Sequence, residues 1–149
     1  MFGALWLWVV PLSGQTVSLD TAGAQYRAQP RLIDSLAQRT LVWARRLRLF
    51  DWRITVRADS LADAVAQTYV HPDYKMALVI FDTKNADAWD EARVIVHELL
   101  HIKISPYTTT ARLLGAHAYM TRDLARREEE LVTSLVHVLC PQETPCSGS

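Results

Sequence analysis

The segment His97-Glu98-Leu99-Leu100-His101 constrains this chain most strongly, because its spacing has chemical meaning only in an α-helix. Residues four apart share one face of a helix, so both imidazoles can reach one metal ion, with Glu98 beside it as a proton acceptor. The flanks at 91–96 and 102–104 contain neither Gly nor Pro, and Pro106 is expected to end the helix. The apolar neighbours predict a buried helix, where a metal would supply the partners that polar groups need.

The 149 residues suffice for one domain with its own hydrophobic core. Half of them are hydrophobic and 21% are charged, as expected of a folded globular protein. The 16 basic residues balance 16 acidic ones, so the chain lacks the basic surplus of nucleic-acid-binding domains and no such partner is predicted. The apolar run at residues 2–12 is too short to cross a bilayer as a helix, and no membrane span is predicted.

Both ends of the chain differ from the domain between them. Residues 1–14 are similar to a short secretory signal, which would place the mature protein outside the cytoplasm. The alternative is an apolar strand or helix packed onto a cytoplasmic domain. Residues 141–149 form a C-terminal tail. A disulfide between Cys140 and Cys146 would hold that tail, and two unpaired thiols are the alternative.

The first half of the chain predicts one helix followed by a small sheet. Residues 15–30 are expected to be an irregular lead-in, and a single domain is expected over 31–140. Apolar residues at three- and four-residue spacing predict a helix, and alternation predicts strands. The expected elements are a helix over 31–49, a strand over 52–57, a strand or short helix over 64–70, a turn over 71–74 and a strand over 76–81. The last two strands are expected to form a hairpin.

The second half predicts helices. Asp87 is expected to cap the helix that carries the two histidines. Residues 107–110 are expected to be a linker, followed by a helix interrupted at Gly115 and a last helix from 121 or 122 to 139. The whole order indicates an α+β domain in which a three-stranded sheet packs against an N-terminal helix, the His-Glu-x-x-His helix and a C-terminal helix.

A third metal ligand is expected from the acidic run at residues 128–130, because a catalytic zinc site has three protein ligands and one open position. Glu129 shares a helix face with Val132 and Val136, so its side chain is expected to point inward. Glu128 is the alternative ligand, and Glu130 is expected to face solvent. His71 and His137 are expected to be structural or exposed.

The stretch Val-Ile-Val-His-Glu-Leu-Leu-His-Ile at residues 94–102, followed by a helix with Glu129-x-x-Val132-Thr133, resembles the minimal gluzincin-type zinc metallopeptidases of bacteria and phages. The likeness covers about residues 31–139. It implies a zincin-like fold and one Zn²⁺ held by His97, His101 and Glu129. It also implies Glu98 as the catalytic base, and an extended peptide substrate paired along strand 76–81.

This resemblance predicts hydrolysis of a peptide bond by a metal-activated water. A donor for the developing oxyanion is expected from Tyr119 or His117, with Tyr107 and Tyr74 as further candidates. A second hypothesis is a zincin-like binding or regulatory module that holds metal and cleaves little. A third is a chance motif within a structural helix.

Overall fold

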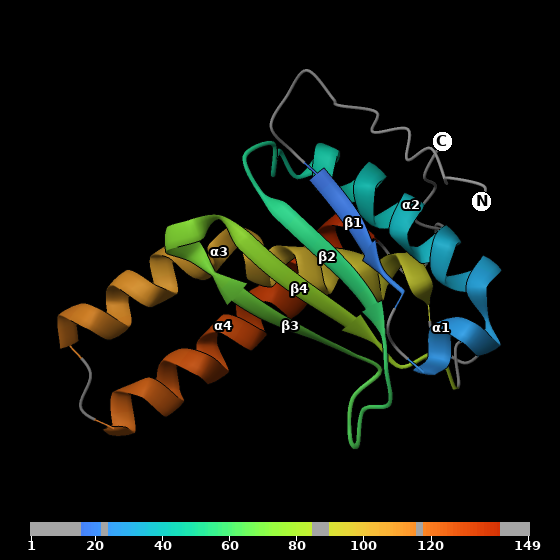
Figure 1. Cartoon of the computed structure of the whole chain (residues 1–149). Helices are drawn as coiled ribbons and strands as arrows, with labels where there is room; N and C mark the ends of the chain where they lie inside the picture. The colour runs from blue at the N-terminus through green and yellow to red at the C-terminus, as the bar shows by residue number, and fades with distance from the viewer. Residues whose placement is uncertain (1–15, 22–23, 85–89, 116–117, 141–149) are drawn as a thin grey trace.

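A computed structural model describes residues 16–21, 24–84, 90–115 and 118–140 of the chain (Figure 1). They form an α+β fold, as predicted. The elements in chain order are β1 (Thr16–Asp20), α1 (Ala24–Ala28), α2 (Pro30–Arg46), β2 (Arg53–Ala58), β3 (Ala66–His71), the 3₁₀ helix η1 (Pro72–Tyr74), β4 (Met76–Phe81), α3 (Glu91–Gly115) and α4 (Ala118–Leu139).

The sheet has four strands in the order β1-β2-β4-β3, one more than predicted. β1 pairs in parallel with β2, from Thr16 opposite Arg53 to Asp20 opposite Arg57. The expectation of an irregular lead-in over 15–30 is therefore wrong, since that stretch holds β1 and α1. The half-buried Val17 and Leu19 alternate with polar residues along β1 and pack against the core, which gives this short strand its apolar face.

The predicted hairpin is confirmed. Residues 66–71 form a strand and not the short helix that was the alternative. β3 and β4 pair antiparallel from Ala66 opposite Phe81 to His71 opposite Met76. β4 also pairs in parallel with β2, so both of its backbone edges are used within the sheet. The expectation that strand 76–81 offers an edge to a peptide is therefore wrong. β3 is the edge strand on that side of the sheet.

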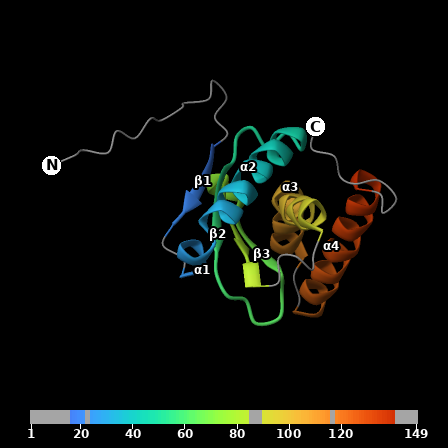
Figure 2. The same cartoon turned by 90° about the vertical axis from the view of Figure 1, so that its right-hand side faces the viewer.

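Helices α2 and α3 lie against the same face of the sheet, and α4 packs on α3 (Figure 2). Alternate residues of the central strands point toward these helices, as the periodicity of β-strands requires. The fully buried core includes Leu36, Ile54, Val56, Val79, Phe81, Ile95, Leu99 and Val132. On the other face, β1 and β2 are joined by polar pairs, among them Arg57 Nε donating to Asp20 at 2.8 Å. The buried face of the sheet is therefore the face against which α3 packs.

Helix α3 continues through Pro106 to Gly115, so the predicted stop at Pro106 and the linker over 107–110 are wrong. A proline lacks the N–H that would pair with the carbonyl four residues earlier, here that of Ile102. Ser105 Oγ donates to the Ile102 carbonyl oxygen at 3.0 Å and replaces that bond. The helix therefore passes the proline without leaving this buried acceptor unpaired.

The ends of the helices agree with the sequence in part. Asp90 Oδ1 accepts the backbone N–H of Arg93 at 3.2 Å and so caps the start of α3. The predicted cap, Asp87, lies outside the described residues. α4 ends at Leu139 as expected, although it begins at Ala118, before the predicted 121.

Cys140, the last described residue, is fully buried and disulfide-bonded, whereas Cys146 and the remaining tail lie outside the described residues. The same is true of residues 1–14, on which the signal and packed-segment alternatives depend. None of the described helices is long and apolar enough to cross a membrane.

Candidate metal centre

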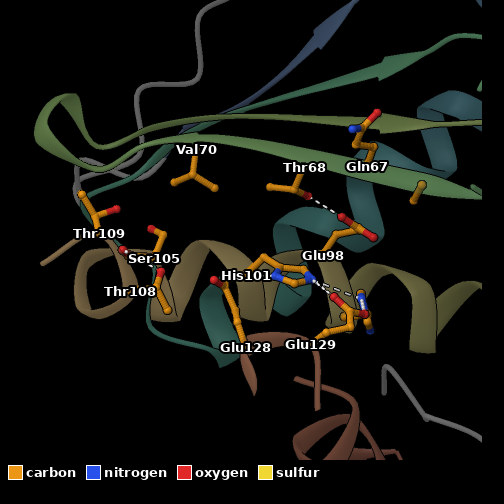
Figure 3. A pocket seen from close by; sticks show the side chains of 12 residues that line it. Gln67, Thr68, Val70, Glu98, His101, Ser105, Thr108, Thr109, Glu128 and Glu129 are labelled. Carbon is orange, nitrogen blue, oxygen red and sulfur yellow. Dashed lines mark hydrogen bonds and ion pairs between the residues drawn. The ribbon is translucent and has the colours of Figure 1, made fainter. Parts of the chain in front are cut away.

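Two helices bring the predicted site residues together. Helix α3 carries His97, Glu98 and His101, and its neighbour α4 presents Glu128 and Glu129 toward them (Figure 3). The packing of α4 depends on Val132, which is fully buried, as the apolar stripe predicts. The side chain of Glu129 nevertheless remains 56% exposed, so the expectation that it points inward is wrong, although it reaches both histidines. The edge strand β3 lies along the other side of the site.

His97, His101 and Glu129 each offer one ligand atom, and these atoms all lie within 4.8 Å of one another, so the group can hold a metal ion. His97 Nε2 is 3.0 Å from Glu129 Oε1, and His101 Nε2 is 3.2 Å from Glu129 Oε2. The two Nε2 atoms are themselves 3.2 Å apart. The two imidazole rings thus face each other through their Nε2 atoms, as the four-residue spacing of the histidines along the helix predicts.

Glu128 has a different position from Glu129. Its Oε1 lies 3.2 Å from His101 Nδ1, the ring nitrogen on the opposite side from the cluster. Its side chain is only 12% exposed, compared with 56% for Glu129. The alternative in which Glu128 joins the two histidines as a ligand is therefore not the arrangement in this structure.

Glu98 is buried and points toward β3 rather than into solvent (Figure 3). Burial raises the pKa of its carboxyl group, which the hydrogen bond from Thr68 partly offsets. Thr68 Oγ1 donates to Glu98 Oε2 at 2.6 Å. For His101, burial opposes protonation, but the carboxylates of Glu128, Glu98 and Glu129 outweigh it and raise the pKa.

Two hollows meet at this cluster, and both are lined by Ala66, His97, Glu98 and Glu129. One has a volume of about 430 Å³ and a wall of hydroxyl side chains, from Thr68, Ser105, Thr108 and Thr109. The other, of about 570 Å³, is more apolar and adds Val65, Val94 and Val136 to its lining. The cluster therefore lies in a groove between β3 and the two long helices, open on both sides of the histidines.

Within the described part of the chain, none of the expected oxyanion donors lines this groove. Tyr74 and Tyr107 are 72% and 75% exposed and line neither hollow. His117 and the side chain of Tyr119 lie outside what the structure describes. His71 is exposed on the edge strand, and the exposed His137 lines the more apolar hollow.

Sequence reasoning missed Thr68, the hydroxyl that holds Glu98. Thr68 alternates with Ala66 and Val70 on the helix-facing side of β3, and that alternation was the signal that could have identified it. Thr108 and Thr109 also line the wall of hydroxyl side chains, because the segment predicted as a linker continues α3.

Comparison of the chain with protein-family models, with curated proteins and with solved structures finds no match.

Proposed function

We propose that this protein is a zinc-dependent hydrolase of peptide bonds, of the gluzincin type that the sequence resembles. The observation that carries the proposal is the convergence of His97, His101 and Glu129 in one groove, with Glu98 buried beside them. Two imidazole nitrogens and one carboxylate oxygen are a donor set that catalytic zinc uses, with a fourth position left open.

The distances are compatible with a small tetrahedral ion, and the ligand types favour zinc over calcium or magnesium. Ligand atoms bound tetrahedrally at about 2.0–2.1 Å lie about 3.3 Å from one another, a value that follows from the bond length and the angle. The three facing pairs here lie 3.0, 3.2 and 3.2 Å apart. Calcium and magnesium favour sites made of oxygen atoms, which a pair of imidazoles does not provide.

The chain's own residues then divide the work of hydrolysis. When bound, zinc supplies Lewis acidity that polarises a carbonyl group and lowers the pKa of water. Glu98 accepts the proton of the attacking water and returns it to the leaving amine, and its raised pKa suits a group that must do both. Thr68 keeps that carboxylate on the strand side of the groove.

A peptide substrate would pair with β3 rather than with the strand predicted from the sequence. β3 is the sheet edge beside the groove, and extended peptides add to such edges through backbone hydrogen bonds. Ala66 of this strand lines both hollows, and Thr68 lines the one with the hydroxyl side chains. A chain bound there would cross the metal cluster with residues on both sides of it.

The test combines metal analysis with hydrolysis of a quenched fluorescent peptide library. Wild type purified with Zn²⁺ should hold one equivalent of metal and cleave the library. Glu98→Gln should retain zinc and lose at least about 100-fold in rate, since a general base contributes about that much or more. Glu130→Gln is the matched control, because Glu130 is exposed on α4 and pairs with Arg126.

Stoichiometric zinc without turnover in wild type would contradict the peptidase proposal and leave the metal-binding module. Absence of zinc from wild type would contradict both functions and leave a structural helix with a chance motif.

A further inference from the structure

The carboxylate of Glu128 lies where it can control the chemistry of His101 without joining the metal cluster. Its Oε1 is 3.2 Å from His101 Nδ1, while His101 Nε2 faces Glu129 at 3.2 Å and His97 at 3.2 Å. The two ring nitrogens of His101 thus have two separate sets of partners. One helix, α4, supplies both carboxylates from adjacent residues.

A neutral imidazole has one N–H and one lone pair, and only the nitrogen with the lone pair can bind a metal. A carboxylate accepts hydrogen bonds and cannot donate them, so Glu128 favours the tautomer in which Nδ1 carries the hydrogen. That tautomer leaves the lone pair on Nε2, which faces Glu129 and His97. The carboxylate also opposes rotation of the ring away from the cluster.

Burial strengthens this contact. The side chain of Glu128 is 12% exposed and that of His101 is 20% exposed, so water competes weakly for either group. A hydrogen bond between such partly buried groups fixes orientation more firmly than one at a surface. Glu130, two residues along the helix, has an exposed side chain that pairs with Arg126 instead.

We propose that Glu128 is a positioning residue, which sets the tautomer and ring orientation of His101 so that Nε2 is ready to bind the metal. This inference rests on the proposed metal centre. Carboxylates that hold a ligand histidine in this way change metal affinity by about 10–100-fold. Because Glu128 adds a negative charge beside the site, part of that effect is electrostatic, and the amide of glutamine separates the two contributions.

The experiment measures the Zn²⁺ dissociation constant of the full chain by competition with a chromophoric chelator, for wild type, Glu128→Gln, Glu128→Ala and Glu129→Ala. Glu128→Ala should weaken binding about 10–100-fold. Glu128→Gln should weaken it less, since its amide oxygen can still accept the Nδ1 hydrogen. Glu130→Ala is the matched control and should bind as wild type does. Circular dichroism of the metal-free proteins checks that every variant is folded.

Cobalt spectra of the same proteins report the ligand set independently of affinity. Wild type and Glu128→Ala should give visible absorption bands of similar energy and intensity, whereas Glu129→Ala should change them. Binding by Glu128→Ala within twofold of wild type would overturn the positioning role, as would a change of ligand set in that variant. Failure of wild type to bind zinc would instead overturn the metal centre itself and the inference with it.

Discussion

Ser105 should matter for stability only because a proline follows it. Its side chain is buried, and its Oγ donates at 3.0 Å to the carbonyl oxygen of the fully buried Ile102. A buried polar group left without a partner costs about 1–3 kcal/mol. Alanine has the better helix propensity by about 0.5 kcal/mol, which offsets part of this loss. Ser105→Ala should therefore lower the free energy of unfolding by about 0.5–2.5 kcal/mol.

Pro106→Ala provides the matched background. It restores the backbone N–H that can pair with the Ile102 carbonyl, so the hydroxyl of Ser105 is no longer needed. In that background Ser105→Ala should cost nothing and should stabilise the protein by up to about 0.5 kcal/mol. The helix-propensity term cancels between the two backgrounds, which leaves a coupling free energy of about 1–3 kcal/mol between Ser105 and Pro106.

Urea denaturation of the four metal-free proteins, with a common slope, measures this cycle. An equal cost of Ser105→Ala in both backgrounds would refute the explanation given for the passage of α3 through Pro106.

Three further predictions concern the metal, the sheet and the helix pair. Zn²⁺ at about 100 times its dissociation constant should stabilise the protein by about 2.7 kcal/mol and raise Tm by about 5–11 °C. Differential scanning fluorimetry measures this shift, and the His101→Ala variant should show none. Backbone N–H groups of Lys84 and Leu61 hold the pKa of Asp82 below its ordinary value. The ionised carboxylate therefore stabilises the fold above the ordinary pKa, and this stabilisation is lost as the pH falls through the lowered pKa of the folded state. Urea midpoints of Asp82→Asn should accordingly vary less with pH below about 5 than those of wild type. Val132→Ala should cost about 1–3 kcal/mol in urea denaturation because Val132 is fully buried, whereas the half-exposed Leu131→Ala should cost under about 1 kcal/mol.

Local periodicity explains what could be predicted from the sequence. The alternation in β2 and the apolar spacing in α2 each reflect one buried face, so these elements were found within a few residues. The same reasoning placed the two histidines on one helix face and favoured Glu129 over Glu128. In the structure Glu129 lies beside both histidines.

The features that were missed depend on interactions between distant segments. β1 is five residues long and gains its partner only after α1 and α2 have returned the chain to β2. The course of α3 beyond Pro106 depends on one side-chain hydrogen bond, which no propensity scale contains. The hairpin fixed the pairing of β3 with β4, but nothing local to it determines which of the two strands also pairs with β2.

The pairing of β4 with β2 determines which strand lines the groove. Because β4 takes the place beside β2, β3 is left with an open edge and lies against α3. The edge strand beside the groove is then also the strand whose Thr68 holds Glu98. If a peptide adds to β3 as proposed, it would pair with the strand that carries Thr68, so substrate binding and the placement of the proposed base would depend on the same strand. Had β3 been the inner strand, Glu98 would face the other strand of the hairpin, with no Thr68 hydroxyl to hold it.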